Sequence, residues 1–232
     1  MPKLLRIMYL IFALGFVIFF HELGHFASCK FFNIRTPVFS LGFGPALIKK
    51  QIGQTTFQIS LLPLGGYVSI NSADLQKASY TQKMIITLAG IFNNFLLSWF
   101  LLCMLFLLDY RRLFPALAQG TKTVMELIRK SFATIFGLLG KKSASQGQLS
   151  AFSIFHHDLQ GFSFFLFFIA TISIELGAFN VLPIPLLDGG QAMEYTLEAA
   201  SSALFGSINY PFIHYIYIIL LIVMILLLNR RK

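Results

Sequence analysis

The chain has 232 residues, of which 56% are hydrophobic and only 12% are charged, and it contains 27 phenylalanines. This composition excludes an ordinary soluble domain and indicates a membrane protein. The net charge of +9 accompanies no motif of a nucleic-acid-binding module, and the basic residues gather at the ends of apolar segments, where they would contact lipid headgroups. Two cysteines, Cys29 and Cys103, do not make a disulfide framework.

The first apolar segment, residues 4–29, predicts a transmembrane helix that carries an unusual polar motif, His-Glu-Leu-Gly-His at residues 21–25. On a helix, His21 and His25 lie one turn apart and face the same way, so their imidazoles can bind one Zn²⁺. Glu22 beside them can take a proton from water. Because such polar side chains are costly in lipid unless they bind a ligand or face a wet cavity, the setting favours a metal site inside the membrane.

Two other interpretations of this segment are weaker. Basic residues followed by an apolar run are typical of a secretory signal, and residues 26–29 faintly resemble a lipoprotein cleavage site. We expect no cleavage, because the polar motif would interrupt the apolar part of such a signal. Cys29 lies four residues after His25 on the same helix face, but a hydrolase needs the fourth zinc position open for water, so we do not expect a Cys29 ligand.

Residues 30–83 predict no span. A turn-rich stretch at 39–45 and an alternating stretch at 55–60 predict a β-hairpin or small sheet over residues 36–70, lying at the membrane face by the metal site. The strand edge at residues 55–60 could hold an unwound substrate segment by backbone pairing. The alternative is a hairpin that only caps the site.

The later apolar segments predict three further transmembrane helices, at 84–108, 162–182 and 211–228. The expected fold is therefore a single domain of the polytopic α-helical membrane class, with about four transmembrane helices and a small membrane-associated sheet after the first. Apolar residues at helical spacing predict an amphipathic helix on the membrane surface at about 121–140. Asn93 and Asn94 in the second span predict either hydrogen bonds between helices or, for Asn94, a side chain that reaches the active cavity.

A catalytic zinc site needs a third protein ligand from another segment. Asp188 is the best candidate, because it follows two prolines in an irregular stretch, residues 183–190, and irregular backbone at membrane depth is tolerated only where protein or a water cavity covers it. Glu175, an acid within the third predicted span, is the alternative.

Four motifs together resemble the site-2 protease family, peptidase M50. They are Phe-Phe-His-Glu-Leu-Gly-His at 19–25, Gly-Phe-Gly-Pro at 42–45, Leu-Pro-Leu-Gly-Gly-Tyr-Val at 62–68 and Phe-Asn-Val-Leu-Pro-Ile-Pro-Leu-Leu-Asp-Gly-Gly at 179–190. The similarity covers nearly the whole chain and is greatest to bacterial members that cleave membrane-embedded anti-sigma factors. It implies an intramembrane zinc endopeptidase of the bacterial inner membrane that hydrolyses bonds within or near transmembrane segments of other proteins.

The resemblance also implies residue roles. His21, His25 and Asp188 are implied as zinc ligands, and Glu22 as the catalytic carboxylate. Asn94 and Asn180 are implied to orient the substrate or to stabilise the developing oxyanion.

The chain departs from the family pattern in several ways. The sigma-regulating members carry one or two PDZ domains between spans two and three, whereas that connection here has only about 50 residues, so we expect no PDZ domain. Ile91 stands where proline is usual, and Glu175 stands where asparagine is frequent, which adds a buried acid with no obvious partner. Family orientation places residues 30–83 and 183–210 in the cytoplasm, although they hold six of the 18 basic residues and the positive-inside rule favours the reverse.

Two rival functions use the same residues. A membrane metal-binding protein or transporter would need a continuous polar path, whereas the polar residues here cluster toward one face. An inactive substrate-binding scaffold would have no need for Glu22.

Overall fold

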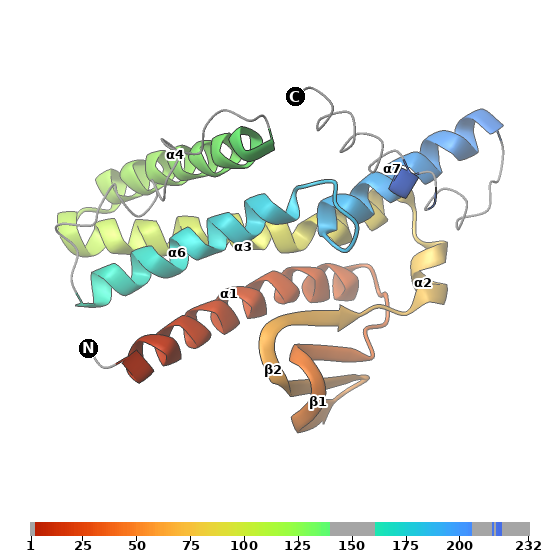
Figure 1. Cartoon of the computed structure of the whole chain (residues 1–232), viewed down its shortest axis with the longest axis horizontal. Helices are drawn as coiled ribbons and strands as arrows, with labels where there is room; N and C mark the ends of the chain where they lie inside the picture. Colours follow the sequence, from red (N-terminus) through yellow and green to blue (C-terminus); the bar gives the residue numbers. More distant parts are fainter. Residues whose placement is uncertain (1–2, 140–160, 206–214, 216, 220–232) are drawn as a thin grey trace.

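Long helices lying side by side make up most of the molecule, and a small sheet lies against the first of them (Figure 1). The structure is a computed structural model that describes residues 3–139, 161–205, 215 and 217–219. In chain order its elements are α1 (Lys3–Phe31), β1 (Val38–Ile52), β2 (Thr55–Ser69), α2 (Ser72–Lys77), α3 (Tyr80–Tyr110), α4 (Leu113–Leu139), α6 (Gly161–Asn180) and α7 (Asp188–Phe205).

In the part of the chain that the structure describes, three helices are long and apolar enough to cross a membrane, namely α1 from Met8 to Phe31, α3 and α6. They confirm the predicted helical membrane fold and coincide with the predicted spans at 4–29, 84–108 and 162–182. The fourth predicted span, 211–228, lies largely outside the described residues. The chain is therefore an integral membrane protein with several membrane-spanning helices.

The apolar core lies where α1, α3, α4 and α6 meet. Its buried members include Val17 on α1, Leu102 on α3, Leu127 on α4 and Ile174 on α6. In a membrane, such helices associate through close packing and a few buried polar contacts rather than through the hydrophobic effect. Ser98 supplies one of these contacts, because its hydroxyl donates to the Ala170 carbonyl across the α3–α6 interface at 2.8 Å.

The predicted amphipathic helix is α4, which begins earlier than expected. Its apolar side packs along α3 and α6, next to which it runs in Figure 1. The expectation that Glu175 is a buried acid without a partner is wrong. Glu175 on α6 is exposed, and its Oε1 accepts a hydrogen bond of 2.8 Å from the Ser131 hydroxyl on α4. The acid links two helices, a contact that no local sequence pattern indicates.

The two long strands fold into a small sheet after α1, as predicted, and pair in antiparallel fashion. Residues 38–41 of β1 align with 56–59 of β2 on one side and with 66–69 on the other. Residues 56–59 in turn also align with 48–51. The expectation of an open edge at 55–60 is therefore wrong, because that stretch has partners on both sides. Residues 48–51 and 66–69 each have a partner on one side only, so they form the two open edges of the sheet.

Side chains flanking the sheet tie its two ends together. Arg35, just before β1, forms an ion pair with Asp74 in α2, just after β2, with Nε–Oδ2 at 2.6 Å and Nη2–Oδ1 at 2.8 Å. Asn71 caps α2 by accepting from the Asp74 backbone N–H. The hydrogen bond from Arg35 lowers the pKa of Asp74 to about 2, so the pair persists over the whole physiological pH range.

Helices α1 and α3 cross with almost no side-chain volume between them. A Cβ on Gly24 of α1 would lie 2.3 Å from the Ala89 carbonyl oxygen of α3. Only glycine allows this approach, which is the usual reason for small residues at helix contacts in membranes. The crossing brings the α3 backbone directly beneath the His-Glu-Leu-Gly-His motif.

We predict that Gly24→Ala destabilises the protein by about 1–3 kcal/mol, because the added methyl group must push α3 away. Gly15→Ala is the matched control, because no atom lies within 4 Å of a Cβ there and alanine is the better helix former. The measurement is the thermal unfolding midpoint of each variant in detergent. Equal midpoints for the two variants would show that the crossing is looser than described.

Candidate metal centre and active site

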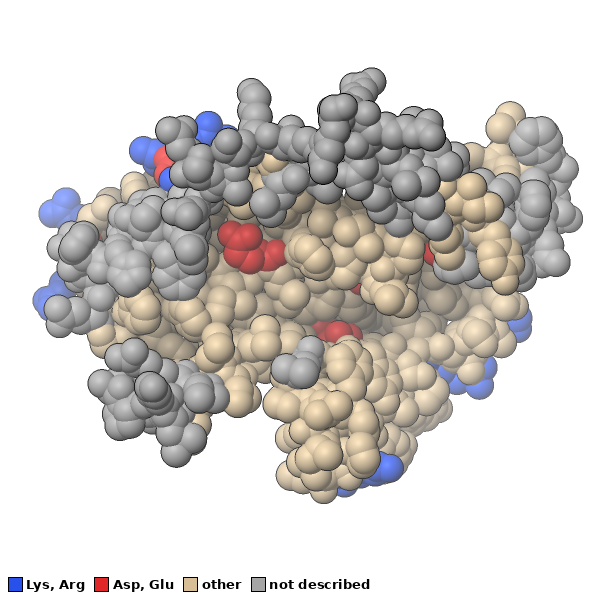
Figure 2. Space-filling model, in the orientation of Figure 1, with Lys and Arg blue, Asp and Glu red and all other residues tan. Residues whose placement is uncertain are grey.

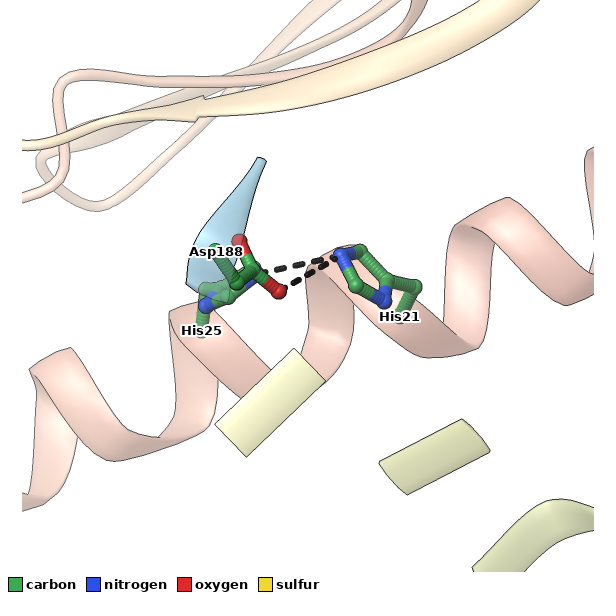
Figure 3. A group of neighbouring side chains, drawn as sticks. All are labelled: His21, His25 and Asp188. Carbon is green, nitrogen blue, oxygen red and sulfur yellow. Dashed lines mark hydrogen bonds and ion pairs between the residues drawn. The ribbon is translucent and has the colours of Figure 1, made fainter. Parts of the chain in front are cut away.

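The His21 and His25 side chains project from one face of α1 and meet Asp188 at the start of α7 (Figure 3). The two Nε2 atoms are 3.2 Å apart. Asp188 Oδ2 lies 3.2 Å from His21 Nε2 and 3.4 Å from His25 Nε2. Three donor atoms, from segments more than 160 residues apart in the chain, thus converge on one point.

The residues present fit a zinc ion. Ligand atoms at about 2.0–2.1 Å from a tetrahedral zinc are about 3.3–3.4 Å from one another, which matches the three separations. Asp188 Oδ2 is also buried and, within the described part of the chain, accepts no well-aligned hydrogen bond although two ring nitrogens face it. Such an oxygen would be costly unless a cation binds it. Two imidazoles and one carboxylate are a ligand set typical of catalytic zinc.

The irregular segment before α7 positions Asp188. Pro183 and Pro185 end the preceding helix, and α7 then begins at Asp188 itself. A Cβ at Gly189 would lie 2.2 Å from the Val181 carbonyl oxygen, and one at Gly190 would lie 2.1 Å from that of Ile184. The two glycines therefore let α7 start against the turn that precedes it, which places the carboxylate opposite the histidines.

Helix α3 contacts the far side of both imidazoles. His25 Nδ1 lies 2.8 Å from the Ile86 carbonyl oxygen, so it donates a hydrogen bond there and leaves the Nε2 lone pair free for a metal. His21 Nδ1 lies 3.0 Å from the Asn94 amide nitrogen. Midway between these contacts, a Cβ at Gly90 would lie 2.4 Å from His25 Nε2 and 2.8 Å from His21 Nε2. The lack of a side chain at Gly90 therefore leaves the space that the two imidazoles occupy against α3.

Glu22 and the metal group share a cavity of about 630 Å³ between α1, β2 and the segment that leads into α7. Glu22 is only 8% exposed. Its side chain packs on β2, since a Cβ at Gly66 would lie 3.0 Å from its Cγ, and its carboxylate is next to the Val68 backbone. Figure 2 shows acidic side chains within the hollowed centre of this face, and the lysines and arginines visible in this view lie at its margins.

The two asparagines implied by the family resemblance lie in different surroundings. Asn180 lines the cavity and donates a hydrogen bond of 3.0 Å to the Leu176 carbonyl of its own helix. Asn94 is fully buried behind His21 and does not line the cavity. Glu175, the alternative third ligand, faces α4 instead of the metal group. Cys29 packs with Ile34 and Ile86 and lies outside the group of three ligands.

Several residues that shape the site escaped the sequence analysis, because they act through their backbone or through their small size. The Ile86 carbonyl, the Gly66 backbone and the close contact at Gly24 belong to this group. Asn93 does not belong to this group, because hydrogen bonding between helices was predicted for it and is confirmed: its side-chain amide donates to the Phe20 carbonyl and joins α3 to α1. The sequence did contain one indication of these contacts. A glycine within a long apolar helix indicates that another backbone approaches closely at that position.

Membrane-spanning helices that carry a buried His-Glu-x-x-His motif, completed by a distant aspartate, define a membrane metalloprotein with the site of a metallopeptidase. Comparison with known proteins agrees. The model of peptidase family M50 matches residues 9–226, and the chain belongs to this family.

Curated relatives include putative zinc metalloproteases of Campylobacter jejuni and Helicobacter pylori. The first is 37% identical over 119 residues, which cover 46% of this chain and 32% of the relative. The second is 34% identical over 145 residues, covering 57% of this chain and 42% of the relative. The chain thus aligns with less than half the length of either relative.

We predict that Gly90→Ala abolishes stoichiometric zinc binding, because the new methyl group would occupy the space between the two Nε2 atoms. Gly137→Ala, where nothing lies within 4 Å of a Cβ, should bind zinc like the wild type. Metal content of the purified proteins, measured after dialysis against zinc-buffered solution, checks both outcomes. One zinc per chain in a folded Gly90→Ala protein would contradict the described site.

Proposed function

We propose that this protein is an intramembrane zinc endopeptidase that hydrolyses peptide bonds within or near transmembrane segments of other membrane proteins. One observation carries the proposal: three metal-ligand atoms 3.2–3.4 Å apart lie beside a buried glutamate in a cavity flanked by membrane-spanning helices. A metal-storage or transport site has no use for Glu22, whereas peptide hydrolysis requires a base in that position.

Different side chains have different roles in the proposed hydrolysis. When bound at His21, His25 and Asp188, zinc supplies Lewis-acid polarisation of the scissile carbonyl and lowers the pKa of water. Glu22 accepts a proton from the attacking water and delivers it to the departing amide nitrogen. Asn180, at the cavity wall, orients the substrate or stabilises the developing oxyanion. Burial of Glu22 excludes bulk water from this proton transfer.

The cavity suits an apolar, extended substrate. Its wall is largely aliphatic and aromatic, and it includes Leu14, Ile18, Phe43, Leu176, Phe179 and Leu186. Residues 65–68 of β2 also line it, and 66–69 form the open edge of the sheet that faces the cavity. A helical substrate hides its carbonyls in internal hydrogen bonds, so it must unwind before attack. The open edge at 66–69 would hold the unwound segment by backbone pairing, and it is closer to Glu22 than the stretch at 55–60.

Candidate substrates are anti-sigma factors and signal-peptide remnants of a bacterial inner membrane, which would make the activity a step in regulated intramembrane proteolysis. Helix α4 takes up most of the connection between α3 and α6, and only residues 140–160 separate it from α6. This stretch is too short for a PDZ domain. We therefore propose that substrates are selected at the cavity and the sheet edge.

Replacing Glu22 by glutamine should abolish cleavage without releasing zinc, because the amide keeps the shape of the side chain but cannot accept the proton. We expect a loss of at least about a hundredfold, the size of a general-base contribution. The assay is cleavage of a tagged single-span protein in detergent or proteoliposomes, together with metal analysis of the same preparations.

Glu175→Gln is the matched control, because this acid bonds to Ser131 on α4 and faces away from the ligands. It should retain both zinc and cleavage. Zinc removal by a chelator should stop cleavage by the wild type, and added zinc should restore it. A zinc-loaded wild type that cleaves none of a panel of single-span proteins would support a metal-binding protein without protease activity. A fully active Glu22→Gln would exclude the proposed base.

Substrates with weakened helices should be cleaved faster, because part of the unwinding is then already done. Two glycines placed next to the scissile bond cost a helix about 2 kcal/mol, which predicts an increase of about tenfold or more in the cleavage rate. The comparison uses two otherwise identical single-span substrates, one with alanines and one with glycines at those positions. Equal rates would indicate that the enzyme does not need to unwind its substrate.

A further inference from the structure

We infer that Asn94 is a positioning residue that fixes the tautomer of His21 by accepting a hydrogen bond from its Nδ1–H. This inference rests on the zinc site of the proposed function. In this role Asn94 acts on the metal ligand His21 and not on the substrate. Its complete burial and its position outside the cavity lining support this assignment.

The contact between the two side chains is direct and buried. The Asn94 amide nitrogen lies 3.0 Å from His21 Nδ1, with both residues buried. The other end of the amide, Oδ1, is buried and has no hydrogen-bond partner among the described residues. With the amide in this orientation, Nδ1 accepts the hydrogen bond, and a neutral ring must then carry its proton on Nε2. That proton would block the atom that faces His25 and Asp188.

A half-turn of the amide removes this conflict. The oxygen and nitrogen ends have nearly the same size and shape, so the turn requires no movement of neighbouring atoms. It places Oδ1 next to Nδ1, so Nδ1–H donates and the Nε2 lone pair becomes free for the ion. In either orientation one end of the Asn94 amide bonds to His21 and the other end has no partner among the described residues. The number of hydrogen bonds is therefore the same and does not decide between the two orientations. Metal binding does, because only one orientation leaves Nε2 unprotonated.

Helix α3 offers each of the two histidines a hydrogen-bond partner for its Nδ1. Ile86, Gly90 and Asn94 are spaced four residues apart and therefore lie along one face of the helix. Ile86 holds His25 through its carbonyl oxygen, Gly90 leaves room for both rings, and Asn94 holds His21. Each imidazole thus has an oxygen of α3 available to its Nδ1, the partner that orients a metal-binding histidine.

Asn94 is itself held rigidly. Its carbonyl oxygen accepts a hydrogen bond of 2.9 Å from the Ser173 hydroxyl on α6, and the Ser98 hydroxyl, whose one proton is shared with the Ala170 carbonyl, also lies 2.9 Å away. This backbone position cannot shift toward the cavity without breaking its contact with α6. The side chain is therefore confined to its place behind His21.

The test is zinc affinity, measured by competition with a chromogenic chelator on the full chain in detergent. All proteins carry Glu22→Gln, so proteolysis cannot interfere. Asn94→Asp keeps an oxygen acceptor in nearly the same shape, and Asn94→Leu keeps the size without an acceptor. We expect Asn94→Asp to bind zinc within a few-fold of the parent and Asn94→Leu to bind 10–100-fold more weakly, the usual effect of losing such a partner.

Asn93→Leu is the matched control, because it removes a half-buried amide that bonds to the Phe20 backbone and not to a ligand. It should lower the unfolding midpoint while leaving zinc affinity unchanged. Nitrogen-15 NMR of the histidine rings in the zinc-loaded parent supplies a readout that does not depend on any Asn94 variant folding. We expect both His21 and His25 to show a protonated Nδ1.

A folded Asn94→Leu with parental zinc affinity, or a His21 ring bound to zinc with its Nδ1 unprotonated, would overturn the inference. So would a folded Asn94→Asp that loses as much affinity as Asn94→Leu. These outcomes are separate from failure of the proposed function. A wild type that binds zinc yet cleaves nothing rejects the protease and leaves the role of Asn94 standing.

Discussion

The structure depends on the close crossing of α1 and α3 at Gly24 and Gly90. At this crossing the backbone of one helix comes within contact distance of the other, so no side chain can screen the histidines from α3. The crossing sets the distance from both imidazoles to the Ile86 carbonyl and the Asn94 amide. It also explains why a motif with two histidines needs a glycine between them, on the face where α3 passes.

The sheet contributes differently, by packing directly on the side chain of Glu22, the proposed base. Gly66 has no side chain, which allows β2 to approach Glu22, and the neighbouring residues 65–68 form one wall of the cavity. The open strand edge and the proposed base therefore lie next to each other. A substrate held along that edge would have its backbone within reach of Glu22 and the metal ligands without a separate delivery step.

The ligand set and the general fold could be predicted from the sequence because their signals are local. A charged motif in an apolar helix and an aspartate after two prolines are visible within a few residues, and the apolar segments set the three described spans. Strand pairing was harder to predict, since residues 38–41 of β1 are flanked by two parts of β2 and alternation does not reveal which stretches form the edges of the sheet. The partners of Glu175 and Asn94 depend on which helix faces turn toward each other, which the apolar pattern of a membrane helix leaves undetermined.

Asp188 enters the metal group from a segment more than 160 residues after the two histidines on α1. A ribosome-bound chain that has inserted only as far as α6 carries two ligands and the proposed base but lacks the third ligand. Such a chain cannot bind a metal ion with all three side chains, so under the proposed function the order of synthesis would keep an incomplete chain from cleaving its neighbours in the bilayer. The metal group is complete only when the start of α7 reaches α1.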